Sequence, residues 1–135
     1  MKVYLAADLA RAEDANALAR DIEQNTPALV VSRWHGQASA SETAAAGVIG
    51  GPESDVALIA AERNLSDIDA SDIFIVLTTG LPVRGGRHFE TGYAFARGKP
   101  IVVVGPVEHA FQHLATRVLS DTSQISDDLM RATIH

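Results

Sequence analysis

The chain has 135 residues, of which 47% are hydrophobic, so it is about the size of one ordinary domain and can bury a real core. Its formal net charge of -6 argues against binding to a nucleic acid polymer, although a small anion would need only a local positive pocket. The sequence has no cysteine, which excludes disulfides and thiolate chemistry and fits a reducing cytosol.

The first apolar run, which ends at Asp8, is too short for a signal peptide or a membrane span. We therefore expect a cytoplasmic protein that does not bind membranes. No internal repeat or linker divides the sequence, so a single domain over residues 1–135 is expected.

Short apolar runs alternate with segments of helical periodicity along the chain. The elements predicted in chain order are strand 2–6, helix 10–24, strand 28–32, helix 54–70, strand 73–77, helix 86–97, strand 101–104, a helical turn at 108–114, strand 118–119 and helix 123–133. Asp8 can cap or lead into the first helix, and Ser123 is a candidate cap for the last. The glycine-rich segment 33–52 shows little periodicity and is expected to be a functional lid or a disordered loop.

This alternation predicts an α/β fold with a doubly wound parallel sheet of five strands and right-handed crossovers. The expected strand order is 2-1-3-4-5, in a three-layer sandwich of the Rossmann or flavodoxin kind. That order places a switch point between the first and third strands, where open α/β sheets bind ligands.

The segment 85–94 follows the third predicted strand and places the carboxylate of Glu90 between glycines and basic residues. A carboxylate at this edge of the sheet can attack a sugar's anomeric carbon through an oxocarbenium-like transition state. The dipole of the helix that begins here favours the ionised form of Glu90. The alternative is that Glu90 is only an acidic residue near a helix N-terminus.

Other side chains are expected at the same edge because they follow neighbouring strands: Tyr4 and Asp8 from the first strand, and Glu108 and His109 from the fourth. The Arg84-Gly-Gly-Arg87 sequence at a helix start could hold a phosphate, with Gly86 giving its backbone close access; a solvated surface turn is equally consistent. The mixture suits a small anionic molecule such as a nucleotide.

Walker and Gly-x-Gly-x-x-Gly patterns are both absent, so neither ATP hydrolysis nor a dinucleotide is proposed, and no cofactor is expected. His109 and His113 have the spacing of a helical metal pair, but no third ligand is evident and no metal is predicted. His88 is interpreted as a structural residue or a substrate contact. Trp34 could stack on a base, although a lone tryptophan more often packs in a core.

Asn64 and Asp67 are three residues apart, so they share a face of the helix that precedes the third strand. Either side chain could point at a ligand from there. A solvated acidic face is the more common arrangement for such a run.

These motifs together resemble the nucleoside 2-deoxyribosyltransferase family, which includes the 2'-deoxynucleoside 5'-phosphate N-hydrolases, and in particular a phage and bacterial branch. The resemblance spans most of the chain and is weakest over 36–52. It rests on segments 2–6, 32–34, 64–68, 70–72, 85–94, 98–100, 104–106 and 111–114.

The resemblance implies cleavage of the N-glycosidic bond of a deoxynucleoside or its 5'-monophosphate. Glu90 falls on the family's nucleophile and Tyr4 on the tyrosine that positions it. Asn64 falls where the family has an aspartate that assists the leaving base, and because asparagine is not an acid, either Asp67 takes this role or base release is weakened. Arg84 stands where transferases carry a base-contacting acid, which favours an anionic substrate.

The resemblance also implies a homodimer or higher oligomer, in which a neighbouring subunit completes each active site around Glu108 and His109. The bond cleavage could end in hydrolysis by water or in transfer of the sugar to a second base, and hydrolysis is favoured. The alternative function is a catalytically inactive nucleotide-binding or signalling module on the same fold. A third and weaker possibility is a flavodoxin-like regulatory domain that binds a protein partner.

Overall fold

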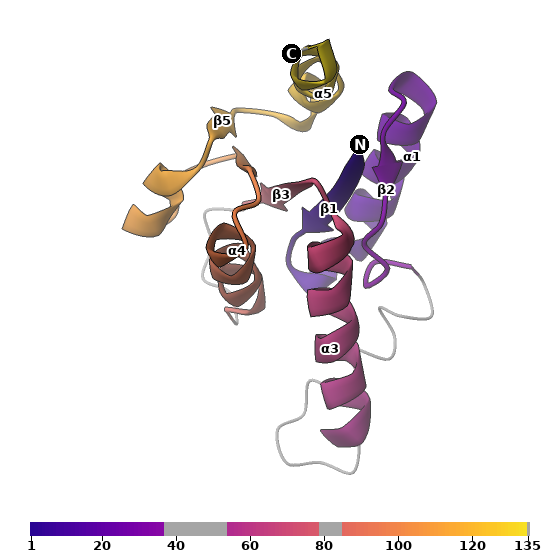
Figure 1. Cartoon of the computed structure of the whole chain (residues 1–135), viewed down its shortest axis with the longest axis vertical. Coiled ribbons are helices and arrows are strands. Elements are labelled where there is room, and N and C mark those ends of the chain that lie inside the picture. Colours follow the sequence, from indigo (N-terminus) through magenta and orange to yellow (C-terminus); the bar gives the residue numbers. More distant parts are fainter. Residues whose placement is uncertain (37–53, 79–84, 135) are drawn as a thin grey trace.

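A five-stranded parallel sheet forms the centre of the protein (Figure 1). The computed structural model describes residues 1–36, 54–78 and 85–134. The strand order is β2-β1-β3-β4-β5 and every pairing is parallel, so the predicted topology and fold class are confirmed. The strands are β1 (Lys2–Ala6), β2 (Leu29–Val30), β3 (Ile73–Leu77), β4 (Ile101–Val104) and β5 (Arg117–Leu119).

Helices cover both faces of the sheet. They are α1 (Ala12–Asn25), α3 (Ser54–Ala70), α4 (Gly86–Ala96) and α5 (Ile125–Ile134), with 3-10 turns η1 (Leu9–Arg11), η2 (Ala110–Leu114) and η3 (Thr122–Gln124). Figure 1 shows α1 and α5 on one side of the strands and α3 and α4 on the other. None of the helices in the described ranges is long and apolar enough to cross a membrane.

Alternate residues of the central strands form two separate cores, because successive side chains point to opposite faces of a sheet. Val3 and Leu5 pack with Leu18 and Ile22 of α1 beneath the α1–α5 layer. The side chains between them, including Tyr4, pack beneath α3 and α4. Both faces are buried, which explains why the strands have continuous apolar sequences.

Two side chains that were considered as helix caps, Asp8 and Ser123, do not cap the backbone, although Asp8 does lead into the first helical region. Asp8 occupies the N-cap position of η1 but makes no capping hydrogen bond, because its carboxylate instead pairs with Arg87. The last helical region begins at Thr122, one residue before the predicted Ser123. Its cap is Asp121, whose side chain accepts a hydrogen bond from the Ser123 backbone N–H at 3.2 Å.

The second strand is shorter than the predicted 28–32. At Ser32 the backbone N–H of Leu5 in β1 donates its hydrogen bond to the Ser32 side-chain oxygen, at 3.1 Å, instead of to a backbone carbonyl of the second strand. The chain then turns at residues 34–36. Residues 37–52 of the predicted lid or loop, and Arg84, lie outside the described residues.

Candidate active site

Glu90 of α4 and Tyr4 of β1 meet at the switch point of the sheet. The Tyr4 hydroxyl donates a hydrogen bond to Glu90 Oε2 at 2.7 Å. Tyr4 is fully buried and its ring stacks on Phe74, with 5.4 Å between the ring centroids. Burial and the neighbouring Glu90 carboxylate raise the pKa of Tyr4 well above its usual value, so the phenol remains a proton donor at neutral pH.

The charge state of Glu90 differs from the expectation. Burial raises its pKa from 4.5 to about 7; the Tyr4 hydrogen bond lowers the pKa, and the nearby Asp67 charge raises it. Glu90 is the fifth residue of α4, and the dipole effect falls off within the first turn of a helix. Desolvation therefore outweighs the helix dipole. The prediction that the dipole would favour the ionised form of Glu90 does not agree with this raised pKa.

A cavity of about 460 Å³ opens beside Glu90. Its walls come from the end of β1, from the turn after β2, and from α3 and α4, and they are mostly apolar. The lining includes the predicted residues Trp34, Asn64, Gly86, Arg87 and Glu90. Three separate segments therefore bring these predicted site residues to one concave surface, of a size that suits a small molecule.

Trp34 and Asn64 differ in their bonding within this cavity. Trp34 is buried, and its indole N–H donates to the Leu5 carbonyl at 2.6 Å, so it is a fixed part of the wall. The Asn64 side-chain oxygen is buried and has no hydrogen-bond partner among the residues that the structure describes. An unpaired buried acceptor costs free energy, which a ligand with a suitable donor would recover.

Asp67 is buried on α3 and is held by Arg33. Arg33 Nη2 and Nε donate to Asp67 Oδ1 at 2.8 and 3.0 Å, and the Arg33 backbone N–H donates to Oδ2 at 3.1 Å. The Asp67 carboxylate lies close enough to raise the pKa of both Tyr4 and Glu90. Asp67 is therefore a charged neighbour of the site.

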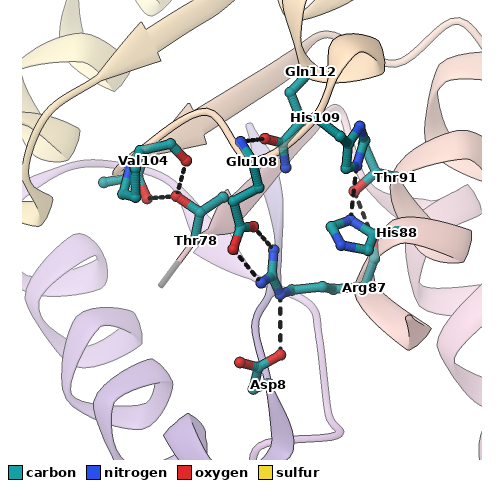
Figure 2. Close-up of polar contacts among 10 residues, drawn as sticks. Asp8, Thr78, Arg87, His88, Thr91, Val104, Glu108, His109 and Gln112 are labelled. Carbon is teal, nitrogen blue, oxygen red and sulfur yellow. Dashed lines mark hydrogen bonds and ion pairs between the residues drawn. The ribbon is translucent and has the colours of Figure 1, made fainter. Parts of the chain in front are cut away.

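Arg87 joins three segments at the carboxyl edge of the sheet (Figure 2). Its Nε donates to Asp8 Oδ1 at 3.0 Å, its Nη2 donates to Glu108 Oε2 at 2.8 Å, and its Nη1 donates to the other Glu108 oxygen. The Arg87 side chain is only 1% exposed. All three guanidinium nitrogens of Arg87 are thus committed to carboxylates, which leaves it poorly suited to the predicted phosphate contact.

His88 and His109 face each other on the far side of Arg87, as Figure 2 shows. His109 Nε2 and His88 Nδ1 are 3.0 Å apart. Burial, together with Arg87 and His109, lowers the pKa of His88, which favours its neutral form. In the described parts of the chain, no three His, Cys, Asp or Glu side chains are grouped as a metal site would require.

The model of the nucleoside 2-deoxyribosyltransferase family matches residues 3–130. The chain belongs to this family. The resemblance expected from its motifs is therefore confirmed, and membership places the chain among enzymes that act on nucleosides or nucleotides. No match was found among curated proteins.

Two solved structures share the nucleoside 2-deoxyribosyltransferase fold with this chain. A 2-deoxyribosyltransferase from the psychrotolerant bacterium Bacillus psychrosaccharolyticus has 17% identity and a TM-score of 0.68, covering 94% of this chain and 91% of its own. The CMP N-glycosidase BcmB of Clostridium botulinum has 18% identity and a TM-score of 0.55, covering 96% of this chain and 98% of its own.

Arg33 is the residue that sequence reasoning missed in this family member. Its segment 32–34 carried part of the family resemblance, but nothing in the sequence indicated that the partner of Arg33 lies 34 positions away on α3. The available signal was its place at the carboxyl end of β2, since that edge of a parallel sheet carries binding residues.

Proposed function

We propose that this protein cleaves the N-glycosidic bond of a nucleoside or a nucleoside 5'-monophosphate, with Glu90 as the nucleophile. The observation that carries the proposal is the Tyr4–Glu90 hydrogen bond beside the cavity. Tyr4 holds Oε2, which leaves Oε1 of Glu90 to attack. Mostly apolar walls, with few polar groups at defined points, are typical of small-molecule sites.

In the proposed reaction, a Glu90 oxygen forms a bond to the anomeric carbon while the carbon–nitrogen bond breaks, and the bonding pair leaves with the base. The base takes up a proton from solvent. Water then attacks the anomeric carbon, gives up one proton to solvent, releases Glu90 as a carboxylate and gives the free sugar or sugar phosphate. A second base in place of water would give transfer; hydrolysis is favoured.

Asn64 is proposed to contact the leaving base, because it lines the cavity with an unpaired amide oxygen. Asparagine can hold a base by hydrogen bonds but cannot protonate it. Both oxygens of Asp67 accept hydrogen bonds from Arg33, so we do not assign the proton donor's role to Asp67. Trp34 and Gly86 are proposed as walls against the substrate.

The test is incubation with the four deoxynucleosides and their 5'-monophosphates, scored by chromatography for free base and for the sugar product. We expect base release from at least one compound, and a loss on the order of 1,000-fold in Glu90→Ala and Glu90→Gln. Mass spectrometry of protein quenched during turnover should find one pentosyl group on the peptide that contains Glu90. Adding a second base distinguishes transfer from hydrolysis.

No base release by the wild-type protein from any of these compounds would contradict the proposal. Full activity in Glu90→Gln would contradict the mechanism. The second candidate is an inactive nucleotide-binding module, which Asn64 in place of an acid favours. Calorimetry that detects nucleotide binding without turnover would support this second candidate.

We also propose that two or more copies assemble around the segment after β4. This segment carries Glu108 and His109, and a second, apolar cavity of about 450 Å³ lies between α4 and η2 beside the exposed Phe111. Exposed apolar patches often mark interfaces. Light scattering should give at least twice the chain mass, and Phe111→Asp should reduce it.

A further inference from the structure

Asp67 places a second negative charge beside the Tyr4–Glu90 pair. It is only 5% exposed, and its charge raises the pKa of both members of the pair. A like charge near a nucleophilic carboxylate opposes ionisation of that carboxylate. The effect of Asp67 on Glu90 therefore depends on how well its charge is compensated.

Arg33 supplies the compensating charge in a fixed geometry. Its side chain is 59% exposed, whereas the Asp67 side chain is 7% exposed, so the cation remains partly hydrated while the anion is buried. Side-chain and backbone donors of Arg33 contact both Asp67 oxygens. The planar guanidinium fork suits such two-oxygen contacts better than an ammonium group does.

The segment that carries Arg33 is anchored on both sides. Ser32 Oγ accepts the Leu5 N–H and lies 2.7 Å from His35 Nε2, and His35 Nδ1 lies 2.7 Å from Asn16 Oδ1. Trp34 donates to the Leu5 carbonyl. Because these bonds attach residues 32–35 to β1 and α1, the Arg33 backbone has a fixed position relative to Tyr4, next to Leu5 in β1.

We propose that Arg33 is a positioning residue for the Glu90 site, which acts by holding the Asp67 carboxylate and offsetting its charge beside the nucleophile. The kinetic part of the test rests on the proposed function of Glu90, whereas the titration part does not. Loss of Arg33 should leave Asp67 uncompensated and make Glu90 harder to ionise. Loss of the Asp67 charge should have the opposite effect.

Each element near the Glu90 site contributes charged or titratable groups, which contact Glu90 directly or contact its neighbours. They are Tyr4 of β1, Arg33 and His35 after β2, Arg63 and Asp67 of α3, and Arg87 of α4 with its partners Asp8 and Glu108. Arg87 is neutralised by two carboxylates, and burial lowers the pKa of His35. Substituting either Arg33 or Asp67 therefore changes the net charge near Glu90 in a direction that can be stated in advance.

The experiment is a carboxyl-carbon NMR titration of the unliganded protein, with the Glu90 signal assigned by its loss in Glu90→Gln. We expect the Glu90 midpoint to rise by about one pH unit in Arg33→Met and to fall by about one in Asp67→Asn. Arg33→Lys, which keeps the charge, should stay close to the wild type. The pH profiles of kcat/KM should move in the same directions, since they report the free enzyme.

Arg97→Met is the matched control, because Arg97 pairs with Asp69 of the same helix α3 at similar exposure, 55% for the arginine side chain. That solvated pair should leave the Glu90 midpoint unchanged. Shifts of equal sign in Arg33→Met and Asp67→Asn, no shift in either, or an equal shift in Arg97→Met would overturn the inference. Opposite shifts in a wild-type background that releases no base would uphold the role of Arg33 and refute the proposed reaction.

Discussion

At the scale of single residues, Glu90 links the proposed chemistry to stability. The folded protein holds the Glu90 proton up to a pKa of about 7, against 4.5 for the unperturbed group. The raised pKa means that the contribution of Glu90 to stability is fully present below 4.5 and is lost as the pH rises through 7. The ionised form of Glu90, which is the proposed nucleophile, thus destabilises the fold that positions it.

We predict that Glu90→Gln removes this pH dependence. Above pH 7 the variant should be more stable than the wild type by at most about 3 kcal/mol, and below pH 4.5 the difference should be much smaller. Urea unfolding across this range measures it, with the exposed Glu62→Gln as control. If the free energy of unfolding of Glu90→Gln fell between pH 4.5 and 7 by as much as that of the wild type, the raised pKa of Glu90 would be refuted.

At the scale of elements, the ends of β3 and β4 are packed tightly at Gly105. This residue has φ +116°, and a Cβ there would lie 2.5 Å from Thr78 Oγ1 and 2.8 Å from the Thr78 carbonyl oxygen. Thr78 Oγ1 itself donates to the Pro106 carbonyl at 2.7 Å. The close approach requires glycine both for its dihedral angle and for its lack of a side chain.

Gly105→Ala should therefore lower the free energy of unfolding by about 2–4 kcal/mol. Gly92→Ala in α4 is the control, because a Cβ at Gly92 would meet nothing within 4 Å. Alanine in a helix interior should leave stability unchanged or raise it by up to about 1 kcal/mol. Thermal or urea unfolding compares the two, and equal effects would contradict the proposed crowding.

The three segments joined by Arg87 allow another prediction at this scale. Arg87→Met would leave the carboxylates of Asp8 and Glu108 close together without their buried cation, at a cost of about 3–5 kcal/mol. Arg87→Lys should recover only part of this loss, since one ammonium group cannot reproduce three directed contacts. Urea unfolding measures both variants, and full recovery by lysine would show that charge alone matters.

At the scale of the whole molecule, periodicity was sufficient to predict the topology. Continuous apolar runs such as residues 73–77 predicted buried parallel strands, and the switch point between β1 and β3 followed from their order. The contact between Tyr4 and Glu90 was predicted because the topology brings both residues to one edge of the sheet and the family resemblance pairs them.

The partners of the charged residues could not be predicted in the same way. Arg87 was considered either as a phosphate contact or as part of a solvated turn, and a sequence does not tell which of several nearby charges an arginine will contact once folded. The Arg33–Asp67 pair and the raised pKa of Glu90 depend on burial and distance across three elements. These properties arise only when the chain has packed, so they cannot be predicted from local sequence patterns.

The single tryptophan of the chain, Trp34, gives the protein a built-in optical reporter. It is 4% exposed and bonded to the Leu5 carbonyl, so its fluorescence should have the short emission wavelength of an indole shielded from water. Because Trp34 lines the cavity beside Glu90, a nucleobase bound there should quench this emission. The occupancy of the cavity should then be readable by titration in the unlabelled protein, including a Glu90→Gln variant in which turnover is expected to be strongly reduced.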